Sequence, residues 1–376
     1  MGLGIYVHLP FCPYICPYCD FAKWPVQQSR AQRYLDALGR EIETIASQPA
    51  ATIFYGGGTP NAYDAETIAA LTRRLRERFP PLHAAQEISI ELNPELVHEG
   101  DFERYAAAGI DRVSIGVQSF VPDEIAVLGR RHTREDVERA VRWARGAALR
   151  SVSLDLIFGV PGQTLETWKR SLDHAVALGV DHISTYGLTV EEGTPYERWQ
   201  MREPAAFPDD DAGADMYGTA IDTLAAAGYE HYEISNFAKR AHRCGHNENY
   251  WANGDYLGLG VGAAGYRGGV RAVHTRSFDA YVEAALAGTP IPSEAERLEG
   301  LAVTGEAIML ALRTAQGVDL AGFKERYGID VLERYAPVVT AYERDGFLER
   351  GGGRLALTRK GRFVANDVCG AFVTFR

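Results

Sequence analysis

The chain has 376 residues, of which 46% are hydrophobic and 24% are charged, the proportions of a folded protein rather than a disordered one. Its formal net charge of −11 argues against broad binding to nucleic-acid phosphates, which needs a positive surface field. The N-terminus shows no export signal, and no stretch approaches the roughly 18–20 uninterrupted apolar residues of a membrane-spanning helix. We therefore expect a cytoplasmic protein.

The first half of the chain alternates short β-rich segments with amphipathic helical segments. Strands are predicted over residues 5–9, 52–55, 87–92, 112–118, 151–158 and 182–188. Helices are predicted between them, over residues 30–46, 65–78, 99–107, 134–147 and 165–178. This order predicts repeated βα units with parallel strands. Propensity alone leaves open a doubly wound sheet and a partial TIM-like barrel, and in both folds ligands gather at the carboxyl ends of the strands.

The pattern changes after about residue 191, where prolines and an acidic run at 209–211 mark a break. We predict a helix ending near residue 227, a strand over 229–235 and a glycine-rich loop over 254–269. Further on, helices over 301–313, 320–327 and 331–345 precede two β-segments, at 347–350 and 354–358, the order of a winged-helix module. The predicted domains are a core (1–190), an α/β extension (191–297) and a small C-terminal domain (298–376).

The five cysteines predict metal chemistry rather than disulfides, because their number is odd and three of them lie within eight positions. Cys12, Cys16 and Cys19 have the spacing C-x3-C-x2-C and follow the first predicted strand. One loop can thus bring three thiolates, which are soft ligands of iron and zinc, to one centre. A [4Fe–4S] cluster held by three cysteines keeps one iron open to a small molecule. The alternatives are a zinc site completed by Cys244 or a histidine, and three unrelated cysteines.

Polar residues also stand at the ends of later predicted strands. Glu91, Gln118 and Asp155 lie in otherwise apolar parallel strands, where a polar side chain is costly unless it has a partner or a ligand. A hydrogen bond to a neighbouring loop would also satisfy each of them. Arg130 follows in Gly129-Arg130-Arg131-His132, where an exposed salt bridge is the alternative to a ligand contact.

The cysteine segment resembles the signature of the radical S-adenosylmethionine (SAM) superfamily, and the resemblance extends nearly from end to end. It implies a partial (β/α)6 TIM-like barrel, a [4Fe–4S] cluster on Cys12, Cys16 and Cys19, and SAM on the open iron. In that superfamily an electron from the reduced cluster cleaves SAM to a deoxyadenosyl radical. The turn at 56–60 resembles the glycine element that approaches the SAM amino group. The residues that the resemblance places at SAM are Tyr6, Gly57, Gly58, Thr59, Glu91, Gln118, Arg130 and Asp155.

Within the superfamily the chain resembles the branch of oxygen-independent coproporphyrinogen III dehydrogenase and the HemW-type heme chaperone. The dehydrogenase pattern continues C-x3-C-x2-C-x-C after a substantial extension, whereas Phe21 follows Asp20 here and Cys12 lies close to the start. The motif H-N-x-x-Y-W at 246–251 resembles a signature of the chaperone branch. The resemblance implies a chaperone that binds heme and delivers it to acceptor hemoproteins. The alternative is the dehydrogenase, which oxidatively decarboxylates porphyrinogen propionates.

The residues of this motif suit heme without specifying how it binds. Imidazole is an ordinary axial ligand of heme iron, so His246 is a candidate, with Cys244 as a competing soft ligand. Tyr250 and Trp251 offer flat apolar surface to a macrocycle. An orienting or packing role of the whole motif is the alternative. The resemblance also allows a homodimer and peripheral association with the inner face of a membrane.

Overall fold

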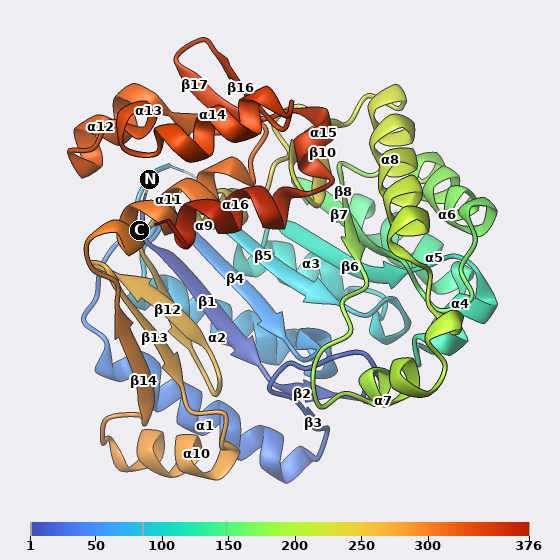
Figure 1. The fold of residues 1–376 in the computed structure, drawn as a ribbon. Helices are drawn as coiled ribbons and strands as arrows, with labels where there is room; N and C mark the ends of the chain where they lie inside the picture. The colour runs from blue at the N-terminus through green and yellow to red at the C-terminus, as the bar shows by residue number, and fades with distance from the viewer. Residues whose placement is uncertain (1, 85, 148, 376) are drawn as a thin grey trace.

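The computed structural model describes residues 2–84, 86–147 and 149–375 (Figure 1). Six parallel strands lie side by side in chain order: β1 (Gly4–Leu9), β4 (Thr52–Gly57), β5 (Glu87–Leu92), β6 (Arg112–Gln118), β7 (Ser151–Phe158) and β8 (His182–Gly187). The helices between them are α1 (Gln28–Thr44), α2 (Ala65–Arg78), α3 (Asp101–Ala108), α4 (Pro122–Val127), α5 (Arg134–Gly146) and α6 (Leu165–Ala177). All the strands and helices predicted for this part are present, with ends shifted by two residues at most.

The strand order decides between the two predicted arrangements. A doubly wound sheet reverses direction at a switch point, whereas here every crossover from β1 to β8 places the next strand on the same side. That order is the order of a barrel. Within the described residues the sheet has two free ends, so the barrel is partial and open, as predicted.

Residues after β8 lengthen the same sheet at both ends. Beyond β1 lie β11 (Tyr256–Leu259), β12 (Ala264–Arg267), β13 (Val270–His274) and β14 (Ser293–Arg297), of which only β11 is parallel to its inner neighbour. Beyond β8 lie β10 (Asn236–Ala238) and β9 (Glu230–Glu233). The sheet thus has twelve strands in the order β14-β13-β12-β11-β1-β4-β5-β6-β7-β8-β10-β9.

Four helices accompany these strands: α7 (Pro195–Arg202), α8 (Asp210–Ala226), α9 (Gly245–Trp251) and α10 (Phe278–Ala287). Phe278 and Tyr281 of α10 are buried and pack against Tyr34 of α1, which joins the extension to the main hydrophobic core. None of the helices in residues 2–84, 86–147 and 149–375 is long and apolar enough to cross a membrane.

The C-terminal domain has a hydrophobic core of its own, which includes Ile308, Leu312, Tyr335 and Leu355. Its helices are α11 (Leu301–Leu312), α12 (Leu320–Tyr327), α13 (Val331–Arg334), α14 (Ala336–Arg344), α15 (Arg359–Arg362) and α16 (Ala365–Val373). Its strands β15 (Val318–Asp319), β16 (Leu348–Gly351) and β17 (Arg354–Leu357) form a small sheet in the order β15-β17-β16. The predicted helix at 331–345 is interrupted at Tyr335, because Pro337 in the first turn of α14 has no amide to continue α13.

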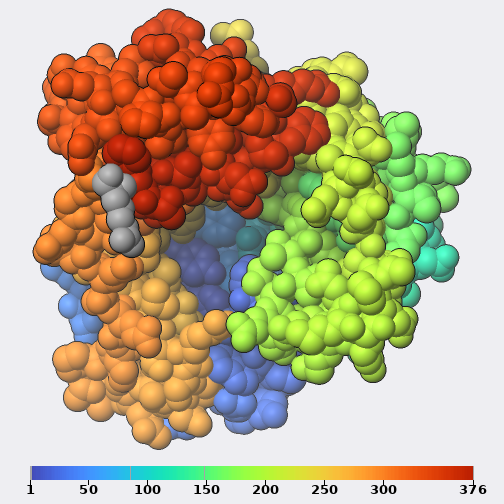
Figure 2. Space-filling view, viewed as in Figure 1, coloured from blue at the N-terminus to red at the C-terminus, as the bar shows by residue number. Residues whose placement is uncertain are grey.

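Figure 2 shows that the molecule is hollowed on one face. The C-terminal domain (red), the β12–β14 and α10 region (orange) and the α7–α8 region (yellow-green) surround the hollow. Residues from the N-terminal part of the chain (blue) lie at its floor. The open side of the partial barrel is therefore accessible from this face.

Candidate cofactor-binding site

The inner face of the barrel is polar because polar residues occupy alternate positions of its strands. In β5 and β7, Ile90 and Leu154 point outward and are fully buried, whereas Ser89, Glu91 and Asp155 point inward. Inward-pointing residues of β5 to β8 line a cavity of about 230 Å³. A second cavity, of about 400 Å³, adjoins it at the carboxyl ends of the strands, and Glu91 and Asp155 line both.

A loop after β1 brings the three predicted cysteines to the larger cavity. Short parallel pairing of β2 (Phe11–Cys12) with β3 (Trp24–Pro25) closes the loop, and the amide of Val26 donates to the Cys12 carbonyl at 2.9 Å. Cys12 is buried, Cys16 and Cys19 are half-buried, and all three are free thiols that line the cavity. The amide of Cys19 donates to the Cys16 carbonyl at 3.3 Å, which fixes the turn between them.

The thiols must lose their protons before they bind iron or zinc. Burial raises the pKa of Cys12 to about 11, so the thiol is protonated until a metal displaces the proton. Among the described residues, no three His, Cys, Asp or Glu side chains are placed around one ion position. Cys244 lines the inner cavity with its Sγ 3.6 Å from Glu87 Oε1, which does not favour the zinc alternative.

The glycine turn after β4 holds the end of that strand against the cysteine loop. Gly58 donates its amide to the Leu9 carbonyl at 2.8 Å, and Thr59 donates to the Phe11 carbonyl at 3.0 Å. A Cβ on Gly58 would lie 2.7 Å from the carbonyl carbon of Pro10. Gly57 has φ +104°, and a Cβ there would overlap the imidazole of His8. At both positions a larger residue would clash with its neighbours. At Gly57 the positive φ is a second reason for glycine.

Two carboxyl groups share the interior of the barrel. Asp155 accepts hydrogen bonds from the Ser114 hydroxyl at 2.9 Å on each oxygen, and burial raises its pKa. Burial and the nearby charge of Asp155 raise the pKa of Glu91 to about 8, although the Gly57 amide donates to it. At neutral pH the Glu91 carboxyl is thus largely protonated and is able to donate a hydrogen bond. Tyr6 lines the inner cavity, where its hydroxyl lies 3.1 Å from His8 Nδ1.

Gln118 and Arg130 also line the cysteine cavity. Gln118 has φ +64°, a conformation that costs on the order of 1 kcal/mol or more for a residue with a side chain, at a bulge where β6 shifts register against β7. Arg130 donates to the Gly116 carbonyl at 2.5 Å. Within the described residues its Nε is buried without a hydrogen-bond partner. A strained glutamine and an unsatisfied guanidinium N–H fit a polar ligand such as an amino-acid carboxylate.

The sequence interpretation missed several residues that also line the cysteine cavity. Tyr186 continues the inward positions of β8, so the alternation along that strand gave a signal for it. The Lys23 ammonium donates to the Cys19 carbonyl at 2.5 Å, and the Tyr14 hydroxyl donates to Glu95 at 2.5 Å. The Tyr14–Glu95 contact depends on how segments far apart in the chain meet, and no local pattern predicts it.

The H-N-x-x-Y-W motif forms α9 and lies against the inner cavity. The imidazole of His246 is buried, with Nδ1 2.7 Å from the Thr52 hydroxyl and Nε2 2.7 Å from the Tyr250 hydroxyl. Burial lowers the pKa of His246 to about 4, so the ring is neutral. Heme ligation by this side chain would require one of these hydrogen bonds to break. These contacts favour the orienting role of the motif.

The comparisons with known proteins agree with this arrangement. The sequence matches the Radical SAM superfamily over residues 6–175 and the HemN C-terminal domain over residues 304–364. It is 35% identical over 373 residues to the heme chaperone HemW of Bacillus subtilis, with 98% of both chains covered. It is 39% identical over 373 residues to the heme chaperone HemW of Mycobacterium tuberculosis, with 97% of this chain and 93% of that protein covered.

A solved structure supports the same fold. Coproporphyrinogen III oxidase (HemN) from Escherichia coli, a radical SAM enzyme, superposes with a TM-score of 0.86 over 100% of this chain and 90% of that one, at 24% identity. A partial barrel with three cysteines after its first strand and a C-terminal domain is thus a radical SAM architecture. The chain belongs to the radical SAM superfamily, in the family whose members are named heme chaperone HemW.

Proposed function

We propose that this protein is a heme chaperone that binds a [4Fe–4S] cluster and SAM and delivers heme to acceptor hemoproteins. The observation that carries the proposal is the identity of 35% and 39% to two heme chaperones over nearly the whole chain. The residue after Asp20 adds support. Phe21 is 59% exposed and lines both cavities of the barrel, where it offers an aromatic surface instead of the further cysteine of the dehydrogenase pattern.

The residues around the cysteine cavity suit the two cofactors in different ways. Cys12, Cys16 and Cys19 would hold the cluster, and the free N–H of Arg130 would bind the SAM carboxylate. Gly57 lines the same cavity, and its backbone would contact the amino group of SAM. When bound, these cofactors supply one-electron reduction of the SAM sulfonium. The Glu91 and Asp155 carboxyls are placed to bind the polar groups of SAM and to exclude water from them.

A second candidate function is the oxygen-independent dehydrogenation of coproporphyrinogen III. The fold match to the HemN oxidase over the whole chain favours it, because the same barrel would hold a porphyrinogen. At 24% identity this match shows the fold alone.

The location in the cytoplasm, a peripheral contact with a membrane and a homodimer stay predictions.

The test is a heme titration followed in the Soret band, on protein reconstituted with iron and sulfide without oxygen. A parallel assay measures protoporphyrinogen formation from coproporphyrinogen III with SAM and a reductant. We expect stoichiometric heme binding and no turnover. Turnover that depends on SAM would contradict the chaperone proposal and support the dehydrogenase.

A matched pair of cysteine variants tests the cluster. Cys16→Ser removes a thiol that lines the cavity and is expected to abolish the visible absorbance of the cluster. Cys369→Ala changes a buried thiol in α16 of the C-terminal core and is expected to leave cluster loading unchanged. Equal cluster content in the two variants would contradict the assignment of Cys16.

A further inference from the structure

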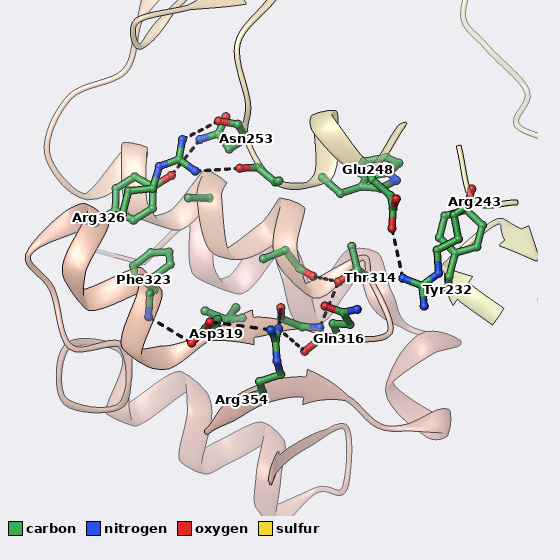
Figure 3. Close-up of a pocket in the computed structure, with 18 residues that line it drawn as sticks. Tyr232, Arg243, Glu248, Asn253, Thr314, Gln316, Asp319, Phe323, Arg326 and Arg354 are labelled. Carbon is green, nitrogen blue, oxygen red and sulfur yellow. Dashed lines mark hydrogen bonds and ion pairs between the residues drawn. The ribbon is translucent and has the colours of Figure 1, made fainter. Parts of the chain in front are cut away.

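A cavity of about 430 Å³ lies outside the barrel, between α9 and the C-terminal domain (Figure 3). One wall comes from the barrel side and includes Tyr232 of β9 and Trp251 of α9. The other wall comes from α11, α12, β15 and β17 of the C-terminal domain. This interdomain cavity shares no lining residue with the two barrel cavities described above. It is therefore a separate space that the proposed cluster and SAM sites do not use.

Its walls suit a flat ring system. Tyr232, Trp251, Phe323 and Tyr327 line it, and the rings of Phe323 and Tyr327 lie with their centroids 4.5 Å apart. Small side chains of α11 leave room between these rings, among them the half-buried Ala311. Aromatic faces bind planar rings by stacking and by apolar burial. The volume lies in the range of about 300–1,000 Å³ that is typical of small-molecule sites.

Charged side chains of both signs line this cavity. Arg243, Arg326 and Arg354 line it against two carboxylates, Glu248 and Asp319, whereas the whole chain has a net charge of −11 (Figure 3). Arg243 lies between Glu230 and Glu248 and forms an ion pair with each. Two carboxylates thus already neutralise Arg243, which leaves Arg326 and Arg354 as the guanidinium groups that could meet an anionic ligand.

Of the three arginines in this cavity, Arg354 has the longest contacts to other protein groups. Its guanidinium lies 3.3 and 3.5 Å from the carbonyls of Gln316 and Gly317, and 3.9 Å from the Asp319 carboxylate. Arg326, in contrast, donates to two carbonyls of the residues that follow α9, at 2.9 and 2.8 Å. The planar fork of Arg354 is thus available for a carboxylate of a ligand.

The Trp251 ring is held in place at the wall of this cavity. The indole Nε1 of Trp251 is buried, and it has no hydrogen-bond partner in the part of the chain that the structure describes. The Arg313 guanidinium stacks over the same ring, at 4.9 Å from its centroid, and holds it in place. The ring is therefore already fixed in place for contact with an aromatic ligand.

We infer that this interdomain cavity binds the carboxylate edge of a porphyrin. The inference rests on the proposed function, because heme is then the planar carboxylate that the protein handles. A porphyrin is larger than the cavity, so it would enter by one edge, with a propionate on Arg354 and its ring between Trp251 and Phe323. The residues that line the cavity include no histidine, cysteine or methionine, so the binding energy would come from the ring and the carboxylates rather than from iron.

The test compares heme titrations of the whole protein and three variants. Arg354→Gln removes the proposed carboxylate partner, and we expect heme to bind about tenfold more weakly. Ala311→Phe fills the cavity from α11, and we expect the affinity for heme to fall at least about tenfold. The matched control is Arg350→Gln. Arg350 lies on the adjoining strand β16, forms an ion pair with Glu343 and does not line the cavity, so we expect unchanged binding.

The porphyrin itself provides a second comparison. Protoporphyrin without iron is expected to bind within about threefold of heme, whereas its dimethyl ester is expected to bind at least about tenfold more weakly. Arg354 is partly exposed, so its variant is expected to fold even if Ala311→Phe does not, and thermal unfolding checks both. If the wild type binds heme and both cavity variants bind it equally well, this inference is overturned. The chaperone proposal would then still stand. No heme binding by the wild type would overturn both.

Discussion

Glu91 shows how the barrel interior changes the chemistry of a single residue. In the sequence it is one acidic residue among many, and only its place at the end of an apolar strand marks it. In the fold its carboxyl group lies near Asp155 and Tyr6 on the inner face of the barrel, where Glu91 is half-buried. The identity of the residue was thus predictable from the sequence. Its protonation was not, because the second carboxyl comes from a strand more than sixty positions later.

The raised pKa of Glu91 predicts an unusual dependence of stability on pH. The folded protein keeps this proton up to about pH 8, whereas the unfolded chain releases it near the ordinary value of 4.5. The folded state therefore binds more protons in this window, and the contribution of Glu91 to the free energy of unfolding decreases as the pH rises. The free energy of unfolding of Glu91→Gln, relative to that of the wild type, is expected to increase by on the order of 2–4 kcal/mol between about pH 5 and pH 8.5.

Urea unfolding of the cofactor-free proteins at several pH values measures this difference. Other carboxyl groups contribute equally to both proteins, apart from Asp155, whose repulsion by Glu91 disappears in the variant. Curves of unfolding free energy against pH that run parallel for wild type and variant would show that Glu91 titrates normally.

At the scale of elements, local sequence patterns are sufficient to predict a strand or helix wherever its apolar residues repeat at regular spacing. The six core strands and their helices were predicted nearly to the residue because apolar positions alternate in the strands and recur every three or four positions in the helices. The segment 254–269 was predicted as a loop, but it contains β11 and β12. Glycine is needed there because a Cβ on Gly258 would overlap the carbonyl of Ala264 on the antiparallel neighbour. The pairing of β11 with β1 joins distant residues, which no local pattern reveals.

The turn after β4 allows a direct test of why glycine occurs there. Gly58→Ala would place a Cβ 2.7 Å from Pro10 and 2.8 Å from the Leu9 carbonyl, so the turn and the cysteine loop must separate. We expect a loss of about 1–3 kcal/mol in stability and lower cluster loading. The matched control is Gly213→Ala in helix α8, where a Cβ meets nothing within 4 Å.

Alanine is the better helix former, so this control is expected to be neutral or more stable by up to about 1 kcal/mol. Thermal unfolding and the iron content after reconstitution report both effects. Full iron content in Gly58→Ala would mean that the contact between the glycine turn and the cysteine loop does not position the thiols.

At the scale of the whole molecule, two hydrophobic cores meet around α9. The barrel holds the first turn of this helix, since the Glu87 carboxylate accepts from the amides of Gly245 and His246 at 3.1 and 3.0 Å. The C-terminal domain holds the other end through Arg326, and an ion pair between Arg271 and Glu306 at 2.8 Å ties the two parts together nearby. The helix with the H-N-x-x-Y-W motif thus has contacts with both domains, one at each end.

Arg326 allows this coupling to be tested. Its two hydrogen bonds satisfy carbonyls at the end of α9, where a cation also interacts favourably with the helix dipole. Arg326→Gln is expected to raise amide hydrogen exchange in residues 245–251 by about tenfold while leaving β1 unchanged, because only the local opening of α9 becomes easier. Lys324→Gln, on the same helix but paired with Asp330 inside the C-terminal domain, is the control and is expected to leave α9 unchanged. If both variants exchange like the wild type, α9 is held by the barrel alone, and the C-terminal domain has no influence on the motif.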